Sequence, residues 1–227
     1  VISPEENREI LYNTRMVSQF GASIETCPVN EVAQTIENRK ARFVKEGKKP
    51  YFITGGGHGN PGTHSYVRAY EEICAQEAQT GIRFDYIFHA SGTGATQAGL
   101  VCGQLLAKDE ARRIVGISIA REKDRGREVV RESIEAYLGA AYERLYRDEA
   151  LVFDASYRCG GYGKYTQEIL DVIGKVMSEE GVPMDTTYVG KAFWGMLQYL
   201  GEKEICGRKI LFLHTGGTPL FFDKLVL

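Results

Sequence analysis

The stretch YIFHASGTGATQAGL, residues 86–100, decides the fold class that we expect for this chain. An apolar run typical of a buried strand is followed by a turn of small residues and then by an apolar pattern with helical spacing. The turn contains six small or hydroxylated residues: Ser91, Gly92, Thr93, Gly94, Ala95 and Thr96. At such a junction the first N–H groups of the helix have no partner within it, and the helix dipole adds to their attraction for an anion. We therefore predict a phosphate-binding turn, with tight helix packing as the competing explanation for the small residues.

The spacing within this turn argues against two common nucleotide sites. The lysine of the GxxxxGK[ST] loop is missing, so hydrolysis of a nucleoside triphosphate is disfavoured. Gly92, Gly94 and Gly99 are not spaced as GxGxxG, which disfavours a dinucleotide. We expect a phosphorylated ligand of another kind.

A second turn of similar character, HTGGTP at residues 214–219, follows an apolar run that we expect to be a strand. In an open parallel sheet, ligands collect at the carboxyl ends of the strands, so the two turns are expected to face the same crevice. Taken alone, the second turn is explained equally well as an ordinary loop.

The whole chain alternates amphipathic stretches of helix length with short β-branched or aromatic runs. This alternation predicts an α/β fold with open, mainly parallel twisted sheets and helices on both faces. The expected helices cover residues 3–21, 30–47, 64–79, 97–106, 125–146 (one long helix or a pair) and 166–177. The expected strands cover residues 23–29, 51–54, 86–90, 114–120, 151–153 and 210–213. A glycine run at 55–57 suggests a boundary, with residues 1–54 as the remainder of a smaller lobe and residues 55–227 as a larger, ligand-binding domain.

Two further segments are candidates for ligand contact. His58 lies in the glycine-rich segment 55–62, where a lone histidine is more often solvent-facing or structural than functional. Tyr157, Tyr162 and Tyr165 surround three glycines and could stack on, or hydrogen-bond to, a ring-shaped ligand. Core packing is the competing explanation for these tyrosines.

Composition excludes several classes of function. The 227 residues are 43% hydrophobic and 26% charged, with a formal net charge of −2, so the excess of basic residues expected of a nucleic-acid-binding protein is absent. No apolar run approaches the roughly 20 residues that cross a bilayer, so we expect no membrane partner. The five cysteines form no CxxC pair and have no nearby histidine at a metal-ligand spacing, which predicts reduced thiols, no metal site and a cytoplasmic protein.

Five segments together resemble the pyridoxal-phosphate-dependent enzymes of the D-cysteine desulfhydrase and 1-aminocyclopropane-1-carboxylate deaminase family, which has the tryptophan-synthase-β-like fold, also called fold type II. They are PYFITGGGHGNPGTHSYV, HASGTGATQAGL, GGYGKYT, EEGVPMDTTYVGKAFWGM and ILFLHTGGTPLFF, in the family's order and at similar separations. The match runs over essentially the whole chain but corresponds only to about the last two thirds of a typical member. We therefore expect the fold to be incomplete at its N-terminus.

The resemblance implies a role for each candidate residue. The turn at 91–96 would hold the phosphate of pyridoxal 5'-phosphate, and Thr215, with Gly216 beside it, would lie near the pyridine nitrogen. Tyr188 resembles a tyrosine close to the cofactor ring and Tyr162 a second active-site tyrosine, which makes both candidates for catalytic contact with substrate. The implied activity is a lyase or deaminase that releases ammonia and an oxo acid from a small amino acid, in a homodimer.

Two departures from the family pattern limit this implication. The residue after Tyr188 is usually a threonine or glutamate that reaches the pyridine nitrogen, but here it is Val189, so that tuning of the ring would rest on Thr215 alone. The family's Schiff-base lysine and its serine–asparagine–histidine segment lie upstream of anything in this chain, and neither Lys164 nor Lys191 replaces the lysine by motif. We therefore expect this chain alone to be inactive.

Two other functions remain open at the level of sequence. The first is a non-catalytic module that binds a phosphorylated ligand with the same fold, which Val189 and the missing lysine favour. The second, a nucleotide-binding α/β protein, ranks last because its motifs are absent.

Overall fold

The computed structural model describes residues 1–4 and 11–224. The chain divides into two compact units, one of residues 1–53 with the described residues from Pro219 onward, and one of residues 54–218. The boundary that we placed between residues 54 and 55 lies one residue from this division. The C-terminal residues, in contrast, group with the first unit and not with the second.

The first unit contains two parallel strands, β1 (Ile2–Pro4) and β2 (Glu25–Cys27). Its other elements are α1 (Tyr12–Gln19), the 3₁₀ turn η1 (Val29–Glu31), α2 (Val32–Lys45) and the C-terminal turn η5 (Phe222–Lys224), with the short helix α9 (Thr218–Phe221) at the division. The predicted helix start at Ser3 and Pro4 is wrong, because Ser3 is extended and pairs with Thr26 of β2. Residues 5–10 of that predicted helix lie outside the described residues.

The strand predicted at residues 51–54 is also wrong. Tyr51, Phe52 and Ile53 are 79%, 46% and 71% exposed and belong to neither sheet. A strand is stable when a neighbouring strand satisfies its backbone N–H and C=O groups, and no strand within residues 1–4 and 11–224 pairs with this segment. The apolar character of residues 51–53 alone is therefore not enough to form a strand.

The second unit alternates strands and helices as the sequence predicts. In chain order its elements are η2 (Gly55–Gly57), α3 (Asn60–Thr80), β3 (Tyr86–Ser91), α4 (Ala95–Ala107), β4 (Arg113–Ser118), α5 (Lys123–Leu138), η3 (Gly139–Ala141), α6 (Tyr142–Leu145), η4 (Asp148–Ala150), β5 (Val152–Asp154), α7 (Gln167–Glu180), α8 (Val189–Glu202) and β6 (Ile210–Phe212). The expected strands and helices from residue 64 to residue 213 are confirmed with shifted ends. Of the two alternatives for 125–146, the structure has the pair of helices, α5 and α6, with η3 between them. Helix α8 was not among the expected elements.

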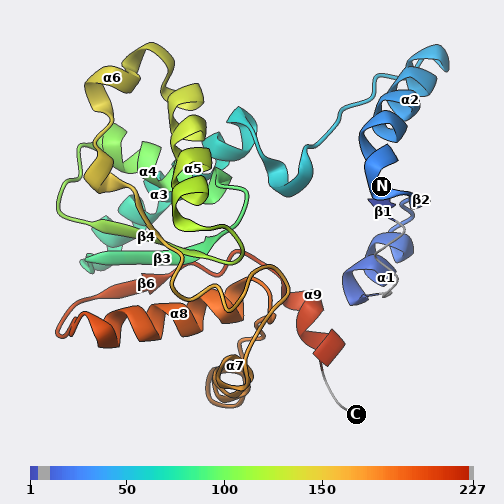
Figure 1. Ribbon diagram of the computed structural model, residues 1–227. Coiled ribbons are helices and arrows are strands. Elements are labelled where there is room, and N and C mark those ends of the chain that lie inside the picture. Colours follow the sequence, from blue (N-terminus) through green and yellow to red (C-terminus); the bar gives the residue numbers. More distant parts are fainter. Residues whose placement is uncertain (5–10, 225–227) are drawn as a thin grey trace. The chain divides into compact units, whose positions relative to one another are not determined.

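The second unit is organised around a sheet with strand order β5-β4-β3-β6, in which every pairing is parallel (Figure 1). Helices α4 and α5 connect β3 to β4 and β4 to β5, while α7 and α8 return the chain from β5 to β6. In Figure 1, α3, α4 and α5 cover one face of the sheet and α8 lies along the other. The chain therefore winds in one direction from β3 to β5 and then returns across the other face to the opposite side of β3.

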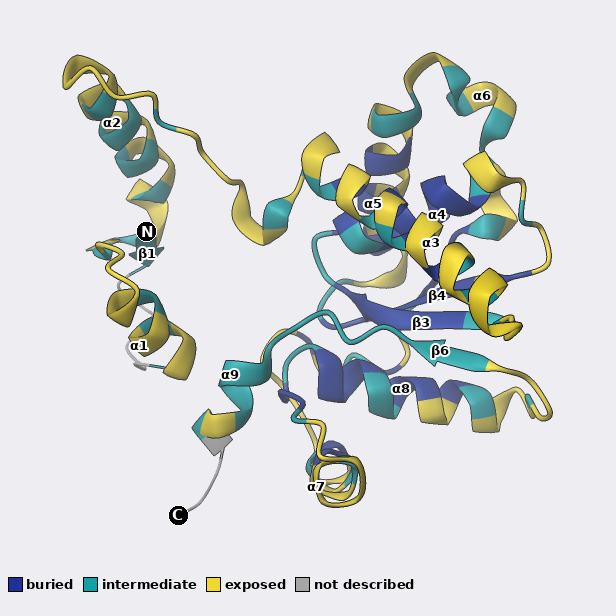
Figure 2. Cartoon of the chain, turned by 180° about the vertical axis from the view of Figure 1, so that it is seen from behind, coloured by how far each residue is buried: buried dark blue, intermediate teal, exposed yellow. Residues whose placement is uncertain are grey.

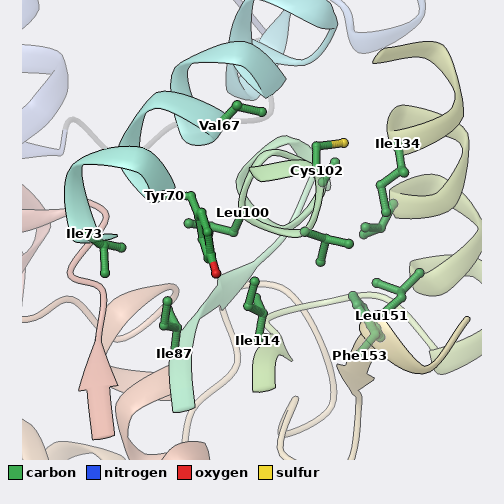
Figure 3. Packing of buried hydrophobic residues seen from close by; sticks show 13 residues of the cluster. Val67, Tyr70, Ile73, Ile87, Leu100, Cys102, Ile114, Ile134, Leu151 and Phe153 are labelled. Atoms are coloured by element: carbon green, nitrogen blue, oxygen red, sulfur yellow. The ribbon is translucent and has the colours of Figure 1, made fainter. Parts of the chain in front are cut away.

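The main apolar core lies between the sheet and α3, α4 and α5 (Figure 3). Buried side chains from both layers meet here, and they include Val67, Tyr70, Ile87, Leu100, Ile114, Ile134 and Phe153. Gly99 and Gly103 let α4 approach α3 closely, since a Cβ at these positions would lie 2.4 Å from Cβ of Tyr66 and 2.6 Å from Cβ of Tyr70 respectively. Figure 2 shows β3 and β4 almost entirely buried, as expected for parallel strands covered on both faces.

The opposite face of the sheet is covered by α8. Phe88, Val115 and Ile117 of the sheet pack with Met196 and Tyr199 of this helix. Within residues 1–4 and 11–224, no helix combines the length and the apolar character needed to cross a membrane.

A histidine is buried completely within this sheet. His89 of β3 is 0% exposed, and its Nδ1 lies 3.0 Å from the carbonyl oxygen of Ala90. Because a carbonyl oxygen only accepts, Nδ1 carries the proton and donates. Nε2 has no hydrogen-bond partner among the described residues. Burial lowers the pKa of His89 to about 4, so the ring is neutral at pH 7.

This buried histidine predicts a loss of stability in mild acid. Between pH 6.5 and pH 4 the unfolded chain binds a proton at residue 89 that the folded chain does not, so the free energy of unfolding falls as the pH falls through this window. We expect urea unfolding at pH 7 and pH 4.5 to show a drop that is about 2 to 3 kcal/mol smaller in His89→Gln than in the unmodified chain. The control is His64→Gln, an exposed histidine of α3. An identical drop in His89→Gln and in the unmodified chain would contradict the assignment.

Candidate functional site

The strand order places the two predicted turns next to each other, because β3 and β6 are neighbouring parallel strands. The direction of winding reverses between β3 and β6, and in open α/β sheets ligands bind outside the carboxyl ends of the strands at such a reversal. Phe88 of β3 pairs with Phe212 of β6, and the N–H of Leu213 donates to the carbonyl of Phe88 at 2.8 Å. Ser91 and Thr215 each follow this pair by three residues. The turns after β3 and β6 therefore leave the same edge of the sheet side by side (Figure 1).

The turn after β3 presents unused backbone donors. The first hydrogen bond of α4 runs from Ala98 N–H to the carbonyl of Gly94 at 2.9 Å, so the N–H groups of Ala95, Thr96 and Gln97 have no acceptor within the helix. Gly94 has φ of 102°, a left-handed conformation that favours glycine. Thr96, with Gly92 and Thr93 of the same turn, is partly accessible. The donors of this turn fit a small anion such as a phosphate group.

Ser91 contributes to this turn differently from the other five residues. It is buried, and its hydroxyl donates to Oε1 of Gln97 at 3.0 Å. Nε2 of Gln97 donates in turn to the carbonyl of Val152 in β5, at 2.7 Å. A Cβ on Gly116 would lie 2.2 Å from Oε1 of Gln97, so the glycine in β4 provides the space for this bridge. The Ser91 hydroxyl therefore anchors the turn to the sheet.

Two neighbouring segments contact the turn at residues 91–96. The guanidinium of Arg121, after β4, donates to the carbonyl of Gly92 and brings a positive charge to the turn. The glycine segment at 55–57 approaches from the other direction, because a Cβ on Gly56 would lie 2.6 Å from Cγ2 of Thr93. His58, two residues further on, is exposed. Arg121 is a residue that the sequence analysis missed.

The turn after β6 is held by His214 and by its two glycines. Nε2 of His214 donates to the carbonyl of Pro183 at 3.0 Å, which leaves Nδ1 free to accept from the N–H of Gly216 at 3.4 Å. Gly216 and Gly217 have φ of 115° and 81°. A Cβ on Gly217 would lie 2.6 Å from Oδ1 of Asp185, so this turn lies directly against the carboxylate of Asp185.

Asp185 fixes the start of α8. Its Oδ2 accepts from the N–H groups of Thr187 and Tyr188, each at 2.8 Å, and its Oδ1 accepts from the N–H of Val189 at 2.9 Å. Asp185 is buried, with 1% of its surface exposed. Three otherwise unpartnered amides at the helix start are thereby satisfied by one carboxylate. Val189, which the sequence analysis singled out, is 1% exposed at the first position of this helix.

The two predicted tyrosines are in contact. The hydroxyl oxygens of Tyr162 and Tyr188 lie 2.5 Å apart, and their rings meet at 78° with centroids 5.8 Å apart. Tyr162 is 63% exposed, and Tyr188 is half-buried. Burial, together with the hydrogen bond to Tyr162, raises the pKa of Tyr188, so this hydroxyl keeps its proton at neutral pH. The pair therefore offers a neutral, proton-bearing group at the surface.

The geometry of Asp185 predicts a large loss of stability when its carboxylate is removed. In Asp185→Ala the N–H groups of Thr187, Tyr188 and Val189 lose their acceptor, and we expect the free energy of unfolding to fall by about 2 to 4 kcal/mol. The measurement is urea denaturation followed by circular dichroism. Asp171→Ala, which removes an exposed carboxylate of α7, is the control and is expected to change stability by less than about 0.5 kcal/mol. Equal losses in the two variants would show that Asp185 does not cap α8.

Curated proteins with similar sequences match most of this chain. A bifunctional D-cysteine desulfhydrase/1-aminocyclopropane-1-carboxylate deaminase of Arabidopsis thaliana is 34% identical over 189 residues, which are 82% of this chain and 46% of the relative. A 1-aminocyclopropane-1-carboxylate deaminase of Burkholderia multivorans is 33% identical over 217 residues, which are 91% of this chain and 63% of the relative. The chain thus spans about half to two thirds of the length of these curated relatives.

A solved structure supports the same relationship. The crystal structure of a homologue of 1-aminocyclopropane-1-carboxylate deaminase matches with a TM-score of 0.79 and 32% sequence identity, over 95% of this chain and 65% of that one. The expected tryptophan-synthase-β-like fold is confirmed. Residues 1–216 match the family model described as pyridoxal-phosphate dependent enzyme. The chain therefore belongs to the pyridoxal-phosphate-dependent enzyme family, whose cofactor is pyridoxal 5'-phosphate.

Proposed function

We propose that the edge formed by the turns after β3 and β6 binds pyridoxal 5'-phosphate, and that the protein is a lyase or deaminase acting on a small amino acid. The observation that carries the proposal is the coincidence of both turns at the reversal of strand order, beside the Tyr162–Tyr188 pair. The products would be ammonia and an oxo acid, with sulfide in addition when the substrate is D-cysteine.

Within this proposal the phosphate is held by the turn at 91–96. The N–H groups of Ala95 and Thr96 supply backbone donors, and the hydroxyls of Thr93 and Thr96 supply side-chain donors. The charge of Arg121 beside Gly92 favours a dianion in this position. The Ser91 hydroxyl takes part indirectly, by fixing the turn through Gln97.

The other candidates are assigned to the ring and to the substrate. Bound pyridoxal phosphate supplies an electron sink for the bond that is broken in the substrate amino acid. Thr215, with Gly216, is assigned to the pyridine side, and its hydroxyl is the polar group available there because Val189 has none. Tyr188 holds a proton that burial keeps on its oxygen, and the exposed Tyr162 orients the substrate beside it.

The names of the relatives support the substrate class. The Arabidopsis protein is named for both D-cysteine desulfhydrase and 1-aminocyclopropane-1-carboxylate deaminase, and both of these substrates are small amino acids. Activity is proposed for a protein with the full length of these relatives, and no lysine of residues 1–227 is assigned as the Schiff-base lysine. The homodimer and the cytoplasmic location stay predictions.

A charge introduced at Thr96 tests the phosphate site. An aspartate in the first turn of α4 is favourable for the helix dipole, so Thr96→Asp is expected to fold at least as stably as the unmodified chain. It also repels a phosphate, and we expect the affinity for pyridoxal phosphate and for competing inorganic phosphate to fall by about tenfold or more. Thr96→Val, which removes only the hydroxyl, is the matched control and is expected to lose affinity several-fold less. Binding is followed by cofactor absorbance.

Binding and turnover measurements distinguish failure of the phosphate site from failure of the proposed activity. Unchanged affinity in Thr96→Asp would refute the phosphate site. Turnover of 1-aminocyclopropane-1-carboxylate and D-cysteine is measured in the protein produced at the length of its relatives, by detection of ammonia. Cofactor binding without turnover of these or of other small amino acids would identify a non-catalytic phospholigand-binding module and overturn the enzyme assignment.

A further inference from the structure

A lysine lies buried directly behind the tyrosine pair. Lys191, in the first turn of α8, is 0% exposed. Its Nζ donates to three backbone carbonyls, those of Gly161 at 2.7 Å, Ile119 at 3.1 Å and Arg158 at 3.2 Å. An ammonium group has three N–H donors and no acceptor, whereas a neutral amine has only two donors. The three carbonyls therefore match the charged form of this side chain.

The charge of Lys191 is opposed by burial and supported by its neighbours. The pKa of Lys191 is lowered overall, because burial outweighs the attraction of its neighbours, among them the carboxylate of Asp185. Asp185 stands six residues earlier in the chain and is itself buried. Burying a charged group costs free energy unless all of its hydrogen-bond donors have acceptors. The three carbonyl contacts therefore stabilise the buried ammonium group of Lys191.

The carbonyls that Lys191 binds belong to the segment that carries Tyr162. Cys159, Gly160 and Gly161 have φ of 51°, 83° and 117°, so three consecutive residues before Tyr162 are in the left-handed region. For Cys159 this conformation is unfavourable. A segment of this kind needs contacts with other parts of the protein to hold one conformation. Lys191 provides such contacts by donating to the carbonyls of Arg158 and Gly161, and it links both residues to Ile119, which follows β4.

The segment that contains Lys191, residues 185–191, also positions the second tyrosine, Tyr188. Asp185 binds the N–H of Tyr188, and Lys191 stands three residues after Tyr188 on the same helix start. Gly190 is required between them, since a Cβ there would lie 2.5 Å from the carbonyl oxygen of Asp185. Residues 185–191 thus hold Tyr188 directly and the Tyr162 segment through one ammonium group.

We propose that Lys191 is a positioning residue, which holds residues 158–161 so that the Tyr162 hydroxyl meets that of Tyr188, and that it is not the lysine that bonds to the cofactor. The functional importance of this pair rests on the proposed function, but the positioning itself is a property of the chain without ligand.

The first test is hydrogen exchange in the ligand-free chain. Lys191→Met keeps the aliphatic stem and removes the three donors, and we expect amide exchange at residues 158–163 to quicken by about tenfold or more. Gln104→Met is the matched control, because Gln104 is also buried and donates to a carbonyl, that of Arg112, near the C-terminal end of α4. It is expected to leave exchange at residues 158–163 unchanged. Unchanged exchange in Lys191→Met would overturn the proposal.

The second test reports on the tyrosine pair. With 3-fluorotyrosine incorporated, the ¹⁹F resonance of residue 188 is assigned from Tyr188→Phe and titrated with pH. We expect the pKa of the labelled residue 188 to be lower in Lys191→Met than in the unmodified chain, because burial remains but the hydrogen bond to Tyr162 is lost, and to be unchanged in Gln104→Met. A titration in Lys191→Met identical to that of the unmodified chain would contradict the role assigned to Lys191.

A second variant and a chemical labelling experiment test the same role of Lys191. If Lys191→Met does not fold, Lys191→Gln, which keeps two N–H donors, is compared in the same two assays. Borohydride reduction in the presence of pyridoxal phosphate, followed by peptide mapping, is expected to leave residue 191 unmodified. Attachment of the cofactor at Lys191 would overturn the positioning role, whereas failure of the chain to bind cofactor would bear on the proposed function and not on Lys191.

Discussion

The parallel pairing of β3 with β4 on one side and with β6 on the other is the constraint on which the rest of the second unit depends. Because α4 and α5 return the chain across one face and α7 and α8 across the other, no single crossover connection covers the carboxyl ends of both β3 and β6. The two turns that leave these ends meet there. The small and hydroxylated residues of the first turn leave Gly92, Thr93 and Thr96 partly accessible.

The part of the site that could be predicted from the sequence is the part built from contiguous residues. The turn after β3 and the TGG turn after β6 each contain their own glycines, hydroxyls and helix start, so the residue pattern suffices. The strand expected at residues 51–54 shows the limit of such local patterns. Its apolar residues are the same whether or not a neighbouring strand is present, and here none pairs with them within the described residues.

The side-chain contacts that the sequence analysis missed join residues that are far apart in the sequence. Gln97 reaches Val152, 55 residues away, and Lys191 reaches Ile119, 72 residues away. A single sequence contains the donor and the acceptor but not their pairing. Helix α8 was missed for a different and local reason, since its N-cap is Tyr188, which has no capping side chain, and the capping carboxylate comes from Asp185, three residues earlier.

Asp185 and Lys191 explain why charged residues, and not apolar packing, hold this part of the site together. Tyr162 is largely exposed and contributes little buried surface, so apolar contacts alone would leave its segment free to move. A carboxylate accepts from three amides and an ammonium donates to three carbonyls, which a neutral glutamine or serine does not match. Each buried charge is thus offset by backbone groups that themselves need partners. The two charges hold the segments of both tyrosines and leave Tyr162 largely exposed.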